Sequence, residues 1–562
     1  MAPIACYVRK PLIHHVEVQV LVLLLVAAFV GMGAHRFRLP YTLALVVAGL
    51  ALGVLDLGIL HDVELNAELL LLLLLPALLF EAAFHIELEE FRRNLVPIFT
   101  LAVPGVMLAA SATAALAYLA LGVTGLVPDF SWREAWLFAA VISATDPVSV
   151  LALFRQFGVP KRLYLVVEGE SLLNDGVAVV LFVVVSAAYG VSTTGRTMDA
   201  DASLLSFGLE TFLVMGVGGS LIGAALGGVF TLVTRTIDDH LIETTLTTLL
   251  AYGSFLIAEQ AHCSGVLSTV FAGIVAGSYG ARLGMTASTR NAVEDFWEYM
   301  AFLANSFIFL LVGLELVPID LLREMPAVVL AFVAVGSARA MVVYIGVPIS
   351  NRFSRPLPRA WTHVMVWGGL RGSLSMVLIL TLPASFPGRA MLVTLVFGVV
   401  GVSLFVQGLT MGPLLRRLGL LEGKQRHDDY ERARAIGIMS RRALDELDAL
   451  ARDGVVEPTV VERLRAWYLQ RSAQADRTAG EALGAGRFSQ QVAETLRRLA
   501  EVERRGIREA TQAAVIDVDI AERLDRELVM RLAALDEAQG STAAALDAAI
   551  DDLIRDVAPP PA

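Results

Sequence analysis

Two short segments carry acidic side chains in otherwise apolar parts of the chain. Residues 143–147 read Ser-Ala-Thr-Asp-Pro, and residues 168–176 read Glu-Gly-Glu-Ser-Leu-Leu-Asn-Asp-Gly, followed by residues 177–185, which carry no charge. An ionisable side chain at the centre of a bilayer costs at least about 2.5–3.5 kcal/mol, so it needs a partner or a function. Both segments are therefore candidates for a polar site inside an apolar environment.

The first segment offers several oxygen atoms at one break in a helix. Pro147 has no N–H, so the carbonyl of Ser143 loses its helical partner. Within lipid, such freed backbone is tolerated only where it lines a cavity. Freed carbonyls, the Thr145 hydroxyl and the Asp146 carboxylate together would make hard ligands for a small cation. The alternative interpretation is a proline kink in which Asp146 caps the next half-helix, and both can hold together.

The second segment predicts a polar stripe along one helix. At helical spacing Ser171 and Asp175 share a face, and Glu170 and Asn174 lie immediately beside it. The same helix continues without charge, so a merely solvated surface is a poor explanation. The stripe is therefore expected to face other polar groups or an ion.

Two arginines in apolar runs need buried partners. Arg339 lies within the apolar residues 333–347, where burying an unpaired guanidinium would cost too much free energy. A buried acidic side chain must therefore pair with it. Glu170 is the natural candidate, while Glu168 and Asp146 remain open as alternatives. The other charges within the spans are Glu81, Glu259 and Arg371, of which Glu259 lies near a span end and is expected to be interfacial.

These residues must be held by membrane-spanning helices. The chain is 56% hydrophobic and only 18% charged, well outside the usual composition of soluble domains. Crossing the hydrocarbon takes about 20 apolar residues, and such runs recur about 13 times between residues 16 and 416. They lie in residues 16–34, 40–58, 67–85, 95–121, 135–154, 164–189, 207–233, 242–260, 263–281, 301–317, 326–349, 361–382 and 391–414.

The charges in the loops predict an orientation. With the N-terminus outside, the inner loops hold thirteen Arg or Lys and the outer loops only four, as the positive-inside rule requires. An odd number of spans fits two inverted six-helix repeats joined by a linker helix. The fifth and twelfth spans then correspond, and both are interrupted, one at Pro147 and the other at Gly368, Gly369 and Gly372. Matched broken helices mark a binding site near the bilayer midplane.

The composition changes near residue 420. Residues 1–420 are predicted to form the transmembrane exchange domain, and residues 421–562 a cytoplasmic helical domain. In the second domain Val460, Leu464 and Trp467 follow helical spacing, and residues 480–486 are expected to separate helices. Regulation or assembly is its expected purpose, with an inert appendage as the alternative. The net charge of −11 contains no basic block, so nucleic acid is not expected as a partner. Two cysteines, with no nucleotide or calcium motif, give no reason to expect a cofactor or a transition metal.

Four motifs taken together resemble one family of transporters. They are LLFEAAF at residues 78–84, ATDPVSV at 144–150, EGESLLNDG at 168–176 and GGLRGSLSM at 368–376. This combination resembles the monovalent cation:proton antiporters of the NhaP and Na⁺/H⁺ exchanger type, across residues 16–416. The Asn174-Asp175 pair resembles the electroneutral branch, since electrogenic relatives carry two aspartates there.

The resemblance implies an ion site built around one carboxylate. Asp175 would alternately bind Na⁺ and H⁺, with Ser171 and the backbone carbonyl of Thr145 as further ligands. Glu81 would reach the ion directly or through water.

The resemblance also implies supporting residues and a homodimer in the bilayer. Asn174 and Asp146 would organise the crossing of the broken helices, and Arg371 would balance the carbonyl ends there. Glu170 would pair with Arg339.

The expected activity is antiport, with no enzymatic chemistry. A buried carboxyl group is costly to ionise unless a cation replaces its proton. This competition couples the movement of the two ions without ATP. The sequence thus predicts 1:1 electroneutral exchange of Na⁺, with Li⁺ as a second candidate, for H⁺ by alternating access. Its role would be pH and sodium homeostasis at the plasma membrane. A K⁺/H⁺ antiporter of the same fold is the nearest alternative. A cation channel is disfavoured because channels place rings of charge or carbonyls along an open pore. A membrane-embedded enzyme is disfavoured because this sequence contains no nucleophile motif and no paired-histidine motif.

Overall fold

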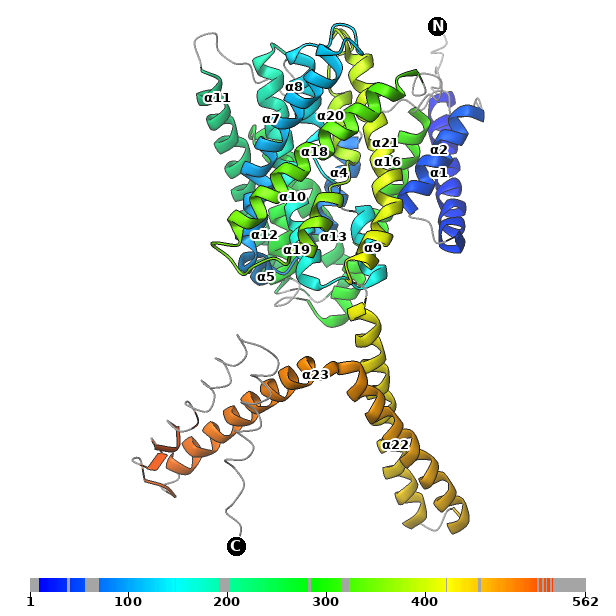
Figure 1. Cartoon of the computed structure of the whole chain (residues 1–562), viewed down its shortest axis with the longest axis vertical. Helices are drawn as coiled ribbons and strands as arrows, with labels where there is room; N and C mark the ends of the chain where they lie inside the picture. Colours follow the sequence, from blue (N-terminus) through cyan, green and yellow to red (C-terminus); the bar gives the residue numbers. More distant parts are fainter. Residues whose placement is uncertain are drawn as a thin grey trace, which may run out of the picture. The chain divides into compact units, whose positions relative to one another are not determined.

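The chain forms two compact units, Met1–Leu420 and Leu421–Ala562. The computed structural model describes residues 10–37, 41–55, 70–146, 148–191, 203–235, 237, 239–280, 285–315, 323–420, 422–452, 456–512 and scattered positions between 515 and 528. Within these ranges the regular structure is entirely helical, which agrees with the predicted all-α fold (Figure 1).

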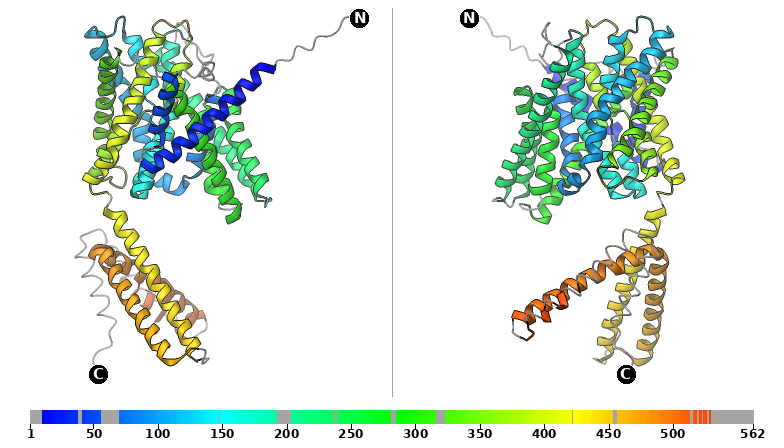
Figure 2. Two further views of the ribbon diagram at one scale, coloured as in Figure 1. Left: turned by 90° about the vertical axis from the view of Figure 1, so that its right-hand side faces the viewer. Right: turned by 60° about the vertical axis from the view of Figure 1, so that its left-hand side comes forward.

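Unit 1 is a bundle of apolar helices. In chain order they are α1 (Lys10–Phe37), α2 (Tyr41–Leu55), α4 (Leu75–Phe84), α5 (Leu88–Arg93), α6 (Leu95–Thr100), α7 (Val106–Ala117), α8 (Trp132–Ile142), α9 (Val148–Phe157), α10 (Lys161–Ala188), α11 (Leu204–Thr211), α12 (Gly218–Thr234), α13 (His240–Gln260), α14 (Gly265–Val275), α16 (Ala287–Glu315), α18 (Met325–Ser350), α19 (Arg359–Trp367), α20 (Ser373–Leu380) and α21 (Arg389–Arg417). Short π-helical turns extend or join several of them, as in the continuous stretch Leu95–Val123. Most helices run side by side, and α1 lies obliquely across them (Figure 2).

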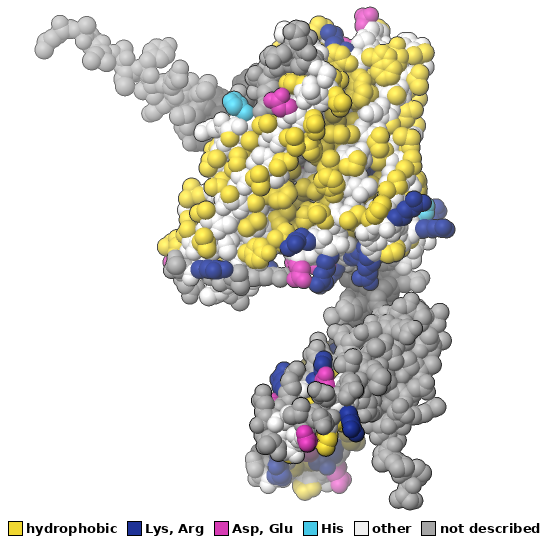
Figure 3. All heavy atoms as spheres, turned by 90° about the vertical axis from the view of Figure 1, so that its left-hand side faces the viewer, with side chains coloured by type: hydrophobic (Ala, Val, Ile, Leu, Met, Phe, Trp, Pro, Cys, Tyr) yellow, Lys and Arg dark blue, Asp and Glu magenta, His cyan; other side chains and the backbone are white. Residues whose placement is uncertain are grey.

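The lengths and surfaces of these helices suit a bilayer. Among the described residues, 7 helices are long and apolar enough to cross a membrane, and four shorter apolar helices accompany them. The pairs α8–α9 and α19–α20 occupy the two spans predicted to be interrupted. Figure 3 shows hydrophobic side chains covering one face of unit 1, with most of the visible Lys and Arg side chains along one rim. The number of crossings stays a prediction.

Helix packing separates unit 1 into two groups around the site. In one group, α16 packs against α2 and α4. The contact with α2 is so close that a Cβ atom on Gly49 would overlap the carbonyl oxygen of Leu310, and the Phe80 and Trp297 rings lie 4.6 Å apart between α4 and α16. In the other group, α10 packs against α8, and α18 against α7 and α21. The ion-site residues predicted from sequence are distributed over both groups.

Unit 2 contains a hairpin of α22 (Glu422–Arg452) and α23 (Pro458–Gln512). The helix predicted from the spacing of Val460, Leu464 and Trp467 is present as part of α23, and these three side chains are 43%, 40% and 51% exposed. The buried positions of the two helices are mostly small side chains: Ala433, Ser440, Leu447, Val461, Ser472 and Ala475. The glycine-containing stretch at residues 480–486 does not end a helix, since α23 continues through it.

Candidate functional site

Two interrupted helices meet at their breaks. Helix α8 ends at Ile142 and α9 begins at Val148, while α19 ends at Trp367 and α20 begins at Ser373. The backbone N–H of Asp146 donates to the carbonyl of Leu370 at 2.9 Å. A Cβ atom added to Gly372 would overlap the Asp146 side chain, so a glycine is required for this approach. Pro147, the predicted cause of the first break, lies outside the described residues.

Arg371 neutralises the end of α8. Its Nη1 donates to the carbonyls of Ile142 at 2.7 Å and Ser143 at 2.9 Å, and it lies 3.4 Å from that of Ala144. The last carbonyls of a helix carry partial negative charge and lack helical partners, so a cation stabilises them. The Ser143 carbonyl also accepts from Asn174 Nδ2 at 3.2 Å. The carbonyl that the sequence predicts to be freed is therefore held by two side chains.

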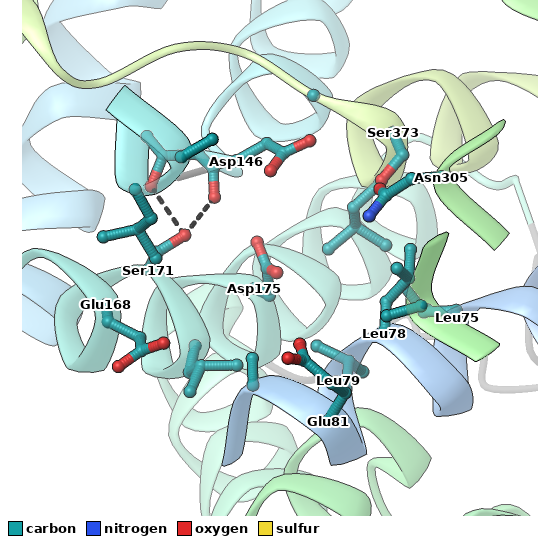
Figure 4. Close-up of a pocket in the computed structure, with 18 of the residues that line it drawn as sticks. Leu75, Leu78, Leu79, Glu81, Asp146, Glu168, Ser171, Asp175, Asn305 and Ser373 are labelled. Carbon is teal, nitrogen blue, oxygen red and sulfur yellow. Dashed lines mark hydrogen bonds between the residues drawn. The ribbon is translucent and has the colours of Figure 1, made fainter. Parts of the chain in front are cut away.

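The polar stripe of α10 faces this crossing. The Ser171 hydroxyl donates to the backbone carbonyl of Thr145, and Asn174 Nδ2 donates to Thr145 Oγ1 at 2.9 Å. Asp175 lies one turn beyond Ser171, and its Oδ1 atom is inaccessible to solvent with no hydrogen-bond partner among the described residues. Figure 4 shows its carboxylate between Ser171 and Asp146 on one side and Glu81 on the other.

These groups border a cavity of about 230 Å³. A water molecule occupies about 30 Å³ of liquid, so the cavity has room for a small cation with several waters. The oxygen-bearing side chains in its lining are Glu81, Thr145, Asp146, Glu168, Ser171, Asp175, Glu298, Asn305 and Ser373. The lining also contains leucines from α4, so carboxylates and apolar side chains share the same small space.

A tyrosine links two charged residues at the cavity. Arg155, in the last turn of α9, donates from Nη2 to the Tyr164 hydroxyl at 2.9 Å. That hydroxyl donates to Glu168 Oε1 at 3.3 Å. Glu168 is thus part of the cavity wall and not the partner of Arg339.

Arg339 is held by Glu170 in a buried ion pair. Its Nη1 and Nη2 donate to Glu170 Oε1 and Oε2 at 2.8 and 2.7 Å, and Nη2 also donates to the carbonyl of Met365 at 3.2 Å. Arg339 and Glu170 are only 7% and 2% exposed. The pair joins α18 to α10, and the Met365 bond joins it to α19. Of the three acids left open by the sequence, the structure places Glu170 against Arg339.

Four residues of the cavity escaped the sequence reasoning. Asn305 is uncharged and lies in a run that reads as an apolar span, and Ser373 is an uncharged residue of the motif at residues 368–376. Glu298 and Arg155 lie near predicted span ends, where charge is ordinary. For Asn305, an available signal is a polar amide inside the apolar run at residues 301–311.

Comparisons with known proteins agree on one family. Residues 21–417 match the family described as "Sodium/hydrogen exchanger, transmembrane". The Na(+)/H(+) antiporter NhaG of Bacillus atrophaeus is 37% identical over 470 residues, covering 82% of this chain and 86% of that protein. The Na(+)/H(+) antiporter NhaS2 of Synechocystis sp. is 34% identical over 527 residues, covering 92% of this chain and 93% of that one. The second match is long enough to include much of unit 2.

A solved structure shares the fold. The sodium proton antiporter from Methanocaldococcus jannaschii, determined at pH 8, matches with a TM-score of 0.58 and 16% identity, over 72% of this chain and 99% of that chain. At this identity the match concerns the fold alone. The family match covers nearly all of unit 1, and the predicted family is confirmed. The chain belongs to the sodium/hydrogen exchanger family of multi-pass membrane transporters.

Proposed function

We propose that this protein exchanges Na⁺ for H⁺ across the plasma membrane, with both ions competing for Asp175. One observation carries the proposal most directly. Asp175 Oδ1 has no hydrogen-bond partner among the described residues, yet it borders a cavity lined by other oxygen groups at the crossing of two interrupted helices. The names of the relatives, which are Na⁺/H⁺ antiporters, support the same ions.

Competition at one carboxylate would give obligatory exchange. An ionised carboxylate in a low-dielectric site is costly unless a cation or a proton neutralises it. The empty, ionised form is therefore the state least suited to moving through the membrane. Each return step then requires one ion or the other, which couples the two fluxes without a cofactor.

The neighbours of Asp175 fit a stoichiometry of one proton per cation. The Asn174 amide donates to the Ser143 carbonyl and the Thr145 hydroxyl, so it serves the crossing and has no titratable proton to exchange. The Ser171 hydroxyl donates to the Thr145 carbonyl and accepts from the Thr145 hydroxyl at 3.4 Å, which leaves one lone pair for a cation. Glu81 lines the same cavity from α4. We infer that Ser171, the Thr145 carbonyl and Glu81 complete the cation site, directly or through water.

Orientation and assembly belong to the same proposal. The distribution of Arg and Lys favours an outside N-terminus and a cytoplasmic unit 2. A homodimer would provide a static scaffold against which the ion-carrying helices move. The K⁺/H⁺ alternative keeps all of these features, because hard oxygen ligands suit both cations.

Purified protein in proteoliposomes tests the proposal. A pH-sensitive dye inside the vesicles should report proton movement when Na⁺ or Li⁺ is added outside, and a response to K⁺ alone would favour the alternative. Asp175→Asn should abolish the response while the protein elutes as wild type in size-exclusion chromatography. Asp129→Asn, in a loop where Asp129 has φ 58, is the matched control and should stay active, since asparagine tolerates that conformation. Substantial exchange by Asp175→Asn would remove Asp175 from its role.

A further inference from the structure

Asn305 is a buried residue of the cavity lining whose side-chain oxygen has no hydrogen-bond partner among the described residues. It lies on α16, is 9% exposed, and lines the same cavity as Asp175 and Ser373. Its Oδ1 atom has no hydrogen-bond partner among the described residues. Buried polar atoms are nearly always hydrogen-bonded, and one left alone is destabilising. An unsatisfied oxygen on a residue that lines a cavity therefore points to a ligand that the cavity receives.

Asn305 and Asp175 reach the cavity from helices of different groups. The next residue on α16, Ser306, does not line the cavity and lies 2.8 Å from the Tyr41 hydroxyl of α2. Further along α16, the close contact between Gly49 and Leu310 locks the helix to α2. Asp175 belongs to α10, which packs with the other group of helices. Figure 4 shows Asp175 and Asn305 entering the cavity from different helices, with Asn305 beside Ser373.

The chemistry of a carboxamide separates the two competing ions. An amide oxygen is a neutral, hard donor of the kind that small hard cations take as ligands. A proton bound to Asp175 forms a covalent O–H bond and gains little from a second oxygen across the cavity. A ligand at Asn305 thus increases affinity for the cation and leaves proton affinity nearly unchanged.

We propose that Asn305 Oδ1 is a ligand for the transported cation, supplied by α16 to the site that contains Asp175 of α10. This inference rests on the proposed exchange at Asp175. The ligand set then spans both helix groups, so it is complete only when they are arranged as in this structure. A shift of α10 relative to α16 separates Asn305 from Asp175 and lowers cation affinity, which helps release the cation on the other side.

The test uses the full-length protein with substitutions at neighbouring positions of α16. Asn305→Leu removes the ligand oxygen at similar volume, and Asn305→Asp returns an oxygen at the same place. Ser306→Ala is the matched control, because it removes the contact with Tyr41 on the same helix without altering the cavity lining. Proteoliposome assays give kcat and KM for Na⁺ at fixed pH, together with the pH of half-maximal activity. Protection by Na⁺ against heat, measured on purified protein, reports binding independently of turnover.

The expected result is a loss of affinity for the cation with no change in affinity for the proton. Asn305→Leu should raise the KM for Na⁺ about tenfold, the effect of losing one neutral ligand in a buried site, with kcat little changed. Its protection by Na⁺ should shrink in parallel, and the pH of half-maximal activity measured at saturating Na⁺ should not move. Asn305→Asp should restore KM to the wild-type value or below, and Ser306→Ala should keep it.

Three other outcomes would overturn the inference. A wild-type KM and full Na⁺ protection in Asn305→Leu would show that the amide contacts only water. An equal rise in KM for Ser306→Ala would assign the effect to helix packing. If Asn305→Leu does not fold, an Asn305→Asp protein with tenfold weaker Na⁺ protection would reject the ligand role. Wild-type protein that moves no protons with any cation would instead refute the proposed function, and this inference with it.

Discussion

Replacing Arg339 by alanine should destabilise unit 1 more than replacing Arg371, although both guanidinium groups are buried. Arg339 makes two charge-assisted bonds to Glu170, at 2.8 and 2.7 Å, and that carboxylate is 2% exposed. Arg339→Ala leaves the carboxylate buried and uncompensated. Breaking a buried ion pair in this way costs about 3–5 kcal/mol.

Replacing Arg371 leaves neutral backbone groups, and not a carboxylate, without their partner. Its described side-chain bonds go to backbone carbonyls of Ile142, Ser143 and Ala144, which are neutral. One of them, Ser143, keeps the bond from Asn174. Loss of hydrogen bonds from a charged donor costs about 1.5–3 kcal/mol. The two variants should therefore differ in stability by about 2 kcal/mol, with Arg339→Ala the weaker.

The comparison can be made in detergent by heating purified protein and measuring the folded fraction by size-exclusion chromatography. Arg339→Ala should lose its folded peak at a lower temperature than Arg371→Ala. Glu170→Gln should also be destabilised, and the charge-swapped double variant Glu170→Arg, Arg339→Glu should recover part of the loss. The reasoning fails if Glu170→Gln is as stable as wild type, or if Arg371→Ala melts first.

Three further predictions follow from the crossing and from the proposed mechanism. Gly372→Ala should reduce exchange strongly in the proteoliposome assay, because its Cβ would overlap the Asp146 side chain; wild-type activity would mean that the crossing can open freely. Exchange should be electroneutral, because Asn174 cannot release a proton beside Asp175. Clamping the membrane potential with K⁺ and valinomycin should leave the initial rate unchanged. A systematic voltage dependence would mean that a second acid also carries a proton. The effect would be easily measured, because moving one uncompensated charge is worth about 2.3 kcal/mol per 100 mV. Cross-linking in native membranes should yield a dimer, and a product that is only monomeric would count against the static scaffold.

Several features could be predicted from the sequence because their causes are local. An acid in an apolar run is costly wherever the helix lies, so Asp146, Glu170 and Asp175 stand out without any tertiary information. A cluster of glycines breaks a helix by its own backbone properties, which locates the second interruption. The division near residue 420 follows from composition alone, and it agrees with the two compact units of the structure.

Other features were decided only by tertiary structure. Which acid meets Arg339 depends on the rotation of α10 and its position against α18, so Glu168 and Glu170 could not be separated by spacing. In unit 2, Val461 is 7% exposed and its neighbour Val460 is 43% exposed, a difference that helical spacing does not predict. Asn305 is uncharged, so its presence in an apolar span does not identify it as a site residue, and only the tertiary structure places it in the lining of the cavity. Hydropathy is a property of neighbours in the chain, whereas an ion site is made by neighbours in space.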